Sequence, residues 1–263
     1  MTRRRLDAEL VRRKLARSRD HAGELIVERT VKVNGLVITK PASQVEESAS
    51  ITVKLKTEDT YVSRGAHKLI GALDSFHIDV TDLVVLDAGA STGGFSEVLL
   101  RRGVAKIFAV DVGYGQLAWK VSQDSKVVVM DRTNIRHTVP EDLGELVDLI
   151  VADLSFISLH TVLPALVGVL KPEGSMLLMV KPQFEVGKDL LGSGGVVDSP
   201  ELRVDSVARV AQYAYELGLG TKGVVASPLP GPSGNVEYFL WLHRQGDAPQ
   251  LEAIELAVKE GPA

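Results

Sequence analysis

The sequence predicts an α/β protein in which a small N-terminal α+β module precedes a larger domain with a mainly parallel seven-stranded sheet. Three observations favour this fold class. The chain has 263 residues, of which 45% are hydrophobic and 24% charged, enough for one sizeable α/β core and a small appended domain. Asn34-Gly35 lies between two short β-rich runs, which is a strong hairpin signal. From residue 83 onward, apolar strand patterns alternate with helical patterns.

The composition indicates the cellular compartment of the protein and excludes sites that are built from cysteine. Because the chain has no cysteine, it can form neither a disulfide nor a cysteine-ligated metal centre. The start, "MTRRRLDAEL", is basic but lacks the apolar core of a signal peptide, and no stretch reaches the length that spans a bilayer. We therefore expect a cytoplasmic protein with no membrane partner, and the sequence gives no sign of an obligate protein partner.

The charge of the chain is unevenly distributed. Residues 1–19 carry eight basic and two acidic side chains, a net charge of +6, whereas the rest of the chain carries −10. A basic patch on an otherwise acidic protein favours a phosphate backbone as the partner. A solvated basic helix face explains the charge alone equally well.

The first 60 residues predict two helices followed by a hairpin. Apolar residues recur at helical spacing within residues 6–15, and Ser18 is a candidate N-cap for a second helix that continues through Ile26. The run "VKVNGLVIT" then gives two strands joined by a tight turn. We expect the arginines of this module to face outward, and we interpret residues 54–62 as a polar linker to the second domain.

The second domain shows strand and helix patterns in alternation. Its apolar strand candidates are "LVVLDAG", "KIFAVDVG", "KVVVMD", "LVDLIVADLSF", "GSMLLMVKPQF", "TKGVVAS" and "VEYFLWLHR". Helical patterns lie around Gly94–Arg102, Gln116–Ser122, Thr161–Leu170 and Glu201–Leu217. Such alternation is typical of a doubly wound sheet, whose ligands bind beyond the carboxyl ends of the strands.

The ends of the first three strands indicate a nucleotide-like ligand. The turn "LDAGASTGGF" combines glycines with a helix N-terminus, but the dinucleotide fingerprint G-x-G-x-x-G is absent. Three successive strands end in Asp87, Asp111 and Asp131, which suits a ligand with a ribose and an adenine but no pyrophosphate. Any one of these carboxylates alone is more often a structural cap.

The N-terminal module resembles the S4 RNA-binding domain. The resemblance covers about residues 4–53 and depends on "LDAELVRRKLARSRDHAGELI" followed by "VKVNGLVITKPASQV". It implies that structured RNA is bound through shape and phosphate contacts rather than base sequence. The side chains that it would place against RNA are Arg3, Arg4, Arg5, Arg17 and Arg19.

The second domain resembles a Rossmann-like S-adenosylmethionine-dependent methyltransferase of the FtsJ class, through "LDAGASTGGF", "AVDVGYGQL" and "VADLSFISL". With the S4 module, the whole chain resembles the TlyA family of rRNA 2′-O-methyltransferases, whose members are also called haemolysins. This implies an S4-like domain over residues 1–60 and a methyltransferase domain over 61–263. The implied substrates are cytidines of 16S and 23S rRNA in the 30S and 50S subunits.

The same resemblance assigns residues to the cofactor. The methionine end of S-adenosyl-L-methionine would lie against the glycine turn, Asp111 would bind its ribose, and Asp131 would lie near its adenine. The turn residues assigned to cofactor binding are Asp87, Gly89, Ser91, Gly93, Gly94 and Phe95.

The family's K-D-K-E tetrad maps onto four distant positions: Lys68 before the core helix, Asp153 after the fourth strand, Lys181 after the fifth, and Glu237 at the start of the last. In this interpretation Lys181 contacts the 2′-oxygen, and the two carboxylates orient the lysines. Alternatively, Lys181 contacts an RNA phosphate and Asp153 is a strand-end cap. No metal is required. Lys188 is a further candidate RNA contact.

Three other functions are weighed against this one. A base N-methyltransferase is suggested by "DLSF", which distantly resembles a D-P-P-Y motif but lacks both prolines and leaves Lys68 and Lys181 unexplained. A non-enzymatic haemolysin or membrane-lytic protein, and an RNA-binding module with an inactive methyltransferase fold, are the others. For 2′-O transfer we expect the target nucleotide to be flipped out of its helix.

Overall fold

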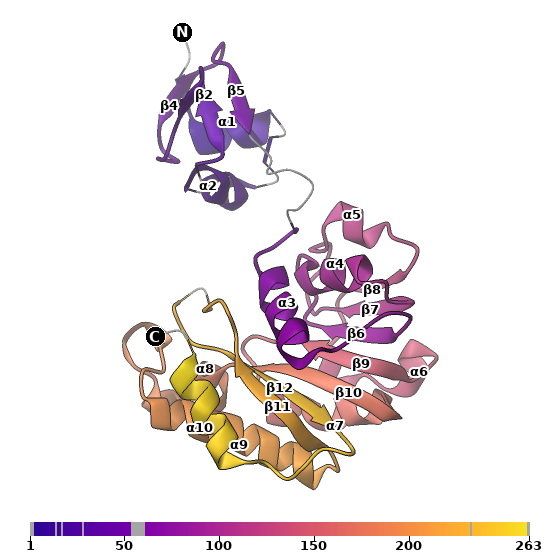
Figure 1. Cartoon of the computed structure of the whole chain (residues 1–263). Coiled ribbons are helices and arrows are strands. Elements are labelled where there is room, and N and C mark those ends of the chain that lie inside the picture. Colours follow the sequence, from indigo (N-terminus) through magenta and orange to yellow (C-terminus); the bar gives the residue numbers. More distant parts are fainter. Residues whose placement is uncertain are drawn as a thin grey trace. The chain divides into compact units, whose positions relative to one another are not determined.

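The computed structural model describes residues 3–13, 15–16, 18–27, 29–53, 61–231 and 233–261, and divides into two compact units, Met1–Thr60 and Tyr61–Ala263 (Figure 1). Arg17 lies outside the described residues, as do the side chains of Arg3 and Lys188. Within these ranges, no helix is long and apolar enough to cross a membrane.

The described residues of the N-terminal unit form two helices and two small sheets. The helices are α1 (Leu6–Arg12) and α2 (Arg19–Val27). The strands are β1 (Arg3–Arg5) paired with β4 (Gln44–Glu46), and β3 (Leu36–Val37), β2 (Val31–Val33) and β5 (Ile51–Val53) in that order in a second sheet. Leu6, Leu10, Ala22, Ile26 and Val31 are fully buried between them.

The hairpin turn and the start of α2 are both explained by the chemistry of nearby residues. Asn34 and Gly35 have φ of 50° and 85°, as a two-residue type I′ turn requires, and β2 pairs antiparallel with β3. The Ser18 Oγ accepts a hydrogen bond from the His21 N–H at 3.1 Å and so caps the start of α2. The strands β1, β4 and β5 had no comparable signal and were not predicted.

Four arginines of the N-terminal unit bind two buried carboxylates of α1; Arg5, Arg12 and Arg19 are exposed, as expected, and Arg13 is half-buried. Arg5 and Arg19 pair with Asp7 at 2.8 and 3.0 Å. Glu9, whose side chain has no exposed surface, pairs with two arginines through its Oε1, with Arg12 at 2.6 Å and with Arg13 at 2.7 Å. Hydrogen bonds from Arg5 and Arg12 hold the pKa values of Asp7 and Glu9, respectively, well below their usual range. Part of the basic charge is therefore balanced inside the unit.

The second unit is built on a seven-stranded sheet with the order β11-β12-β10-β9-β6-β7-β8. Its strands are β6 (Val84–Ala88), β7 (Lys106–Val110), β8 (Val127–Met130), β9 (Val147–Ala152), β10 (Leu170–Val180), β11 (Gly220–Ala226) and β12 (Tyr238–His243). Only β12 runs against its neighbours, since it pairs antiparallel with both β10 and β11. The predicted mainly parallel seven-stranded sheet is confirmed.

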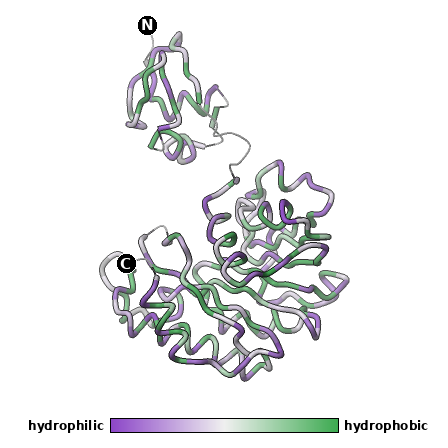
Figure 2. Tube along the Cα trace, viewed as in Figure 1, coloured by the Kyte–Doolittle hydropathy of each residue, from purple (hydrophilic) through white to green (hydrophobic). Residues whose placement is uncertain are grey.

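Helices cover both faces of this sheet. They are α3 (Gly65–Phe76), α4 (Gly94–Arg101), α5 (Trp119–Ser122), α6 (Pro140–Leu143), α7 (Leu159–Val169), α8 (Pro182–Glu185), α9 (Pro200–Glu216) and α10 (Leu251–Glu260). One apolar core joins the sheet to α3 and α4, and another joins it to α7, α9 and α10. Figure 2 shows the corresponding band of hydrophobic residues along the strands. Burial on both faces explains why the strands are continuous apolar runs rather than alternating ones.

Helix α3 corrects the expected position of Lys68. This lysine lies within α3 rather than before the core helix, and it is buried together with Ala66, Leu69, Ala72 and Leu73. The spacing of these residues gives α3 one apolar face, and Lys68 lies on the same side as that face. Neither α3 nor α10 was predicted from the sequence.

We predict that the N-terminal unit loses stability on acidification because its carboxylates have lowered pKa values. Glu9, with its pKa lowered to about 2, stabilises the folded unit above the unfolded pKa of about 4.3, and this contribution disappears as the pH falls toward 2. In wild-type protein, hydrogen exchange of α1 amides, corrected for intrinsic rates, should lose protection between about pH 5 and 3.

Glu9→Gln should weaken protection at pH 7 and flatten its dependence on pH. Glu24→Gln, at an exposed carboxyl of α2, is the matched control and should behave as wild type. Equal protection in the Glu9→Gln and Glu24→Gln variants at pH 7 would contradict the prediction.

Candidate active site

A glycine-rich turn joins β6 to α4 at the carboxyl edge of the sheet. Gly89 and Gly93 have φ of 86° and 92°, a conformation that favours glycine. A Cβ on Gly89 would also lie only 2.7 Å from the backbone oxygen of Asp153. Ser91, between the two glycines, is exposed. The turn therefore presents bare backbone beside a helix N-terminus, which fits a nucleoside-bearing cofactor.

The two carboxylates predicted to bind ribose and adenine hold the neighbouring loops. Asp111 accepts hydrogen bonds from the N–H groups of Ser91 at 2.8 Å and Gly113 at 2.7 Å. Asp131 accepts one from the N–H of Gly115 at 2.9 Å. Both side chains are partly exposed, and a carboxylate has about four acceptor sites, so each can still accept from a ligand hydroxyl or amine.

Two turn residues assigned to the methionine end lie against the protein interior. Phe95 is 4% exposed and packs against Phe239, with ring centroids 6.1 Å apart. Gly94 is buried against α3, where a Cβ would lie 3.1 Å from the Ala66 backbone nitrogen. Gly94 thus packs α4 against α3 and Phe95 packs it against β12, and the open surface of the turn comes from residues before them.

Asp87 is completely buried beneath the turn. Its Oδ2 accepts a hydrogen bond from the Ser96 Oγ at 2.6 Å, and its Oδ1 has no partner among the described residues. Burial raises the pKa of Asp87 to about 7, and the nearby charge of Asp153 contributes in the same direction. Direct contact with a cofactor does not fit this burial, and Asp87 instead supports the start of α4.

The four tetrad positions form two ion pairs. Lys68 Nζ lies 2.5 Å from Glu237 Oε2, and their side chains are 6% and 1% exposed. Lys181 Nζ lies 2.6 Å from Asp153 Oδ1, and these side chains are 9% and 24% exposed. Each nearly buried ammonium is therefore compensated by one carboxylate, which burial of a charge requires.

The sheet register explains how these distant residues reach one edge. Val180 of β10 pairs with Tyr238 of β12, so Lys181 and Glu237 follow as the next positions in the same register. Leu178 of β10 pairs with Ala152 of β9, which Asp153 follows. Because β12 is antiparallel, its beginning lies at the carboxyl ends of the parallel strands.

Three residues around Lys181 were not identified in the sequence. Ser155 accepts a hydrogen bond from Lys181 Nζ at 2.9 Å. Phe156 is 91% exposed with φ of 64°, an unusual conformation for an aromatic residue. Glu185 bonds to the start of α7. Ser155 and Phe156 lie in "VADLSFISL", which carried the resemblance, but the roles of all three residues depend on contacts between distant segments of the chain.

The predicted RNA-contacting arginines whose side chains the structure describes lie at the surface of the N-terminal unit. Arg4 is exposed, and the side chains of Arg5 and Arg19 are 48% and 59% exposed while paired with Asp7. Among the described residues, no group of three or more histidines, aspartates or glutamates could hold a metal ion.

The fold and the site define a class of enzyme. A seven-stranded, mostly parallel sheet with one antiparallel strand next to the edge, and a glycine turn after the interior strand β6, are the features of a Rossmann-like methyltransferase. The same fold occurs in a putative S-adenosylmethionine-dependent methyltransferase from Listeria monocytogenes, with a TM-score of 0.53 at 14% identity over 69% of this chain and 98% of that one.

The chain belongs to the FtsJ-like methyltransferase family, in the TlyA group that carries an S4 domain. The FtsJ-like methyltransferase model matches residues 61–244 and the S4 domain model matches residues 4–51. The resemblances found in the sequence are thus confirmed, and the chain is an S-adenosylmethionine-dependent methyltransferase.

Relatives and solved structures agree with this placement. The chain is 58% identical to the 16S/23S rRNA (cytidine-2′-O)-methyltransferase TlyA of Mycobacterium tuberculosis, over 98% of both chains. It is 33% identical to Hemolysin A of Brachyspira hyodysenteriae, over 89% of this chain and 98% of the other. A putative hemolysin from Streptococcus thermophilus has a TM-score of 0.77 at 34% identity, over 99% and 96% of the two chains.

We predict that Asp87→Asn flattens the pH dependence of stability of the second unit. Because the folded pKa is raised from about 3.9 to about 7, neutral Asp87 is favourable at low pH and this contribution is lost as the pH rises through 7. Wild type should therefore lose about 2–3 kcal/mol from this group between pH 5 and 8.

Urea unfolding at each pH, followed by tryptophan fluorescence, measures the free energy of unfolding of the second unit, because Trp119 and Trp241 both lie in it. Asp87→Asn should not show the loss between pH 5 and 8. Parallel stability curves for the two proteins would show that Asp87 keeps an ordinary pKa.

Proposed function

We propose that this chain transfers a methyl group from S-adenosylmethionine to ribose 2′-hydroxyls of cytidines in 16S and 23S rRNA, acting on the 30S and 50S subunits. The observation that carries the proposal is the juxtaposition of the Lys181–Asp153 and Lys68–Glu237 pairs beside the glycine turn. The name of the Mycobacterium tuberculosis relative supports the choice of substrate. Such a substrate is consistent with a cytoplasmic enzyme.

The residues that would hold the cofactor follow from the open part of the turn. Gly89 and Ser91 would face its methionine end, with Asp111 at the ribose and Asp131 near the adenine. Gly93 is buried at the start of α4 and remains a proposed cofactor residue by resemblance alone. When bound, the cofactor supplies an electrophilic methyl group. The close approach of Gly89 to the backbone of Asp153 brings the turn next to the proposed catalytic lysine.

Lys181 is the group proposed to touch the reacting oxygen. An ammonium has three N–H donors, and Asp153 and Ser155 lie within 2.9 Å of Lys181 Nζ, so one donor can still bind the ribose oxygen. That bond fixes the direction of the oxygen lone pairs, and alignment of this kind contributes much of the rate in transfer reactions. The hydroxyl proton that the methyl group replaces would pass to the Asp153 carboxylate beside Lys181 or to solvent. The buried Lys68–Glu237 ion pair lies at the same edge of the sheet.

Phe156 gives support to the expected flipping of the target nucleotide. Its ring is 91% exposed, lies beside Ser155, and is 5.2 Å from the Phe184 ring. An exposed aromatic face that follows Ser155, the hydrogen-bond partner of Lys181, suits a base that has left its stack, because base–aromatic stacking offsets part of the unstacking cost.

RNA docking is proposed for residues 1–60, and catalysis for residues 61–263. Arg4 and the exposed parts of Arg5 and Arg19 would bind phosphates of folded rRNA. Arg3, Arg17 and Lys188 remain proposed RNA contacts by resemblance alone.

We predict that Lys181→Ala abolishes methyl transfer while the protein stays folded and binds its cofactor. Loss of the group that orients the nucleophile should lower the rate by about 10²–10⁴-fold. Labelled cofactor is incubated with isolated 30S and 50S subunits, and the RNA is digested to nucleosides to locate the label. Label on the ribose supports the proposal, and label on the base would favour an N-methyltransferase. No transfer by wild type to either subunit would refute it.

We also predict that Arg4→Ala weakens subunit binding without changing cofactor affinity. A phosphate contact contributes through counterion release, so the slope of log K against log salt concentration should shrink by about one unit. Glu24→Ala, in the same unit, is the control and should leave the slope unchanged. An unaltered slope for Arg4→Ala would place this residue outside the interface.

A further inference from the structure

Two short segments leave the sheet beside the Lys181–Asp153 pair. One is the loop from Asp153 to Ser158, which leads from β9 into α7. The other is α8, Pro182–Glu185, which begins directly after Lys181. The loop contains Ser155 and the exposed ring of Phe156, so its position decides where two groups of the proposed site lie.

Glu185 ties the far ends of these two segments together. Its Oε2 accepts a hydrogen bond from the Ser158 Oγ at 2.6 Å, and its Oε1 accepts one from the Leu159 N–H at 2.8 Å. Ser158 is the N-cap of α7, so the carboxylate lies at the positive end of that helix and satisfies a backbone N–H that has no partner within it.

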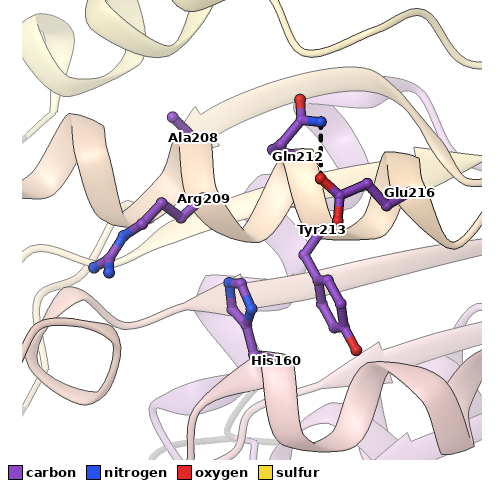
Figure 3. A pocket seen from close by; sticks show the side chains of 6 residues that line it. All are labelled: His160, Ala208, Arg209, Gln212, Tyr213 and Glu216. Carbon is purple, nitrogen blue, oxygen red and sulfur yellow. Dashed lines mark hydrogen bonds between the residues drawn. The ribbon is translucent and has the colours of Figure 1, made fainter.

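Glu185 is itself fixed from the side of α9. Its backbone oxygen accepts a hydrogen bond from Arg209 Nη2 at 3.0 Å. The next turn of α9 contacts the start of α7, where the rings of His160 and Tyr213 stack at 4.6 Å with an angle of 7° between their planes (Figure 3). The bond from Glu185 to α7 therefore joins two elements that α9 already holds in place.

The loop between these anchors is strained. A positive φ such as the 64° of Phe156 costs a non-glycine residue free energy and persists only where the surroundings determine it. The near end of the loop is held by Lys181, which lies 2.6 Å from Asp153 Oδ1 and 2.9 Å from the Ser155 Oγ. At the other end of the loop, Glu185 accepts the hydrogen bonds from Ser158 and Leu159.

We propose that Glu185 is a positioning residue for methyl transfer. Its carboxylate keeps the loop from Asp153 to Ser158 closed against α8, so that Ser155 stays bonded to Lys181 and the Phe156 ring stays exposed beside it. This inference rests on the proposed function, because a positioning role presupposes that the site transfers a methyl group.

Single-turnover methylation of subunits tests the role. Glu185→Ala should lower the rate at saturating cofactor and subunit by about 100-fold, since a misplacement of about 1 Å from a distant substitution can have that effect. The dissociation constants for cofactor and subunits should stay within about threefold of wild type. Glu185→Gln keeps an oxygen for the Leu159 N–H and should recover most of the rate.

The control is Glu216→Ala, which removes a carboxylate of α9 whose hydrogen bond is to Gln212, and it should keep the wild-type rate. If Glu185→Ala does not fold, Ser158→Ala removes one of the two bonds to the same carboxylate and carries the test, with an expected loss of about tenfold. Transfer by Glu185→Ala, or by Ser158→Ala in its place, at the wild-type rate overturns the inference.

A double-variant experiment separates positioning from general destabilisation. Because Glu185 acts through the loop that contains Ser155, Ser155→Ala should reduce the rate in the wild-type background but change it less than twofold in the Glu185→Ala background. Independent, multiplicative losses would mean that Glu185 does not act through this loop. If wild type itself transfers no methyl group, the proposed function fails; an active wild type with multiplicative losses refutes only the role of Glu185.

Discussion

Two lysine ammonium groups lie almost buried at one edge of a sheet, and each is held by a carboxylate from a different part of the chain. An isolated buried ammonium would cost several kcal/mol, and removal of one partner from such a pair typically costs about 3–5 kcal/mol. The strand order and the direction of each strand must therefore bring each lysine to its carboxylate partner. The single antiparallel strand β12 is central to this, because it places Glu237 at the carboxyl ends of the parallel strands.

The sequence was most informative where structure depends on local chemistry. The apolar runs predicted all seven strands of the large sheet, and Asn34-Gly35 predicted the hairpin from its turn preference alone. The glycine turn was recognisable because Gly89 and Gly93 adopt backbone conformations that other residues resist. These features can be read from a short window of residues.

What the sequence did not predict depends on contacts between distant residues. Asp87 is completely buried because helices pack over β6. The sequence shows that three strands end in a carboxylate, but it does not show which of the three is buried. Helix α3 was not expected, so Lys68 was placed before the core helix, whereas it lies buried within α3. The two carboxylates of α1 that bind four arginines are the two already subtracted in the net charge of +6, and which arginines they bind was not evident from the sequence.

The pairing of Lys68 with Glu237 also has a consequence during synthesis of the chain. The two residues are 169 positions apart, which at about 5–20 residues per second means roughly 10–30 s between their emergence. Until Glu237 is made, the nascent chain contains a lysine on an apolar helix face without its carboxylate. Strand β12 thus both joins β11 to the rest of the sheet and supplies a carboxylate to its edge, so translation must have passed Glu237 before the proposed catalytic centre can exist.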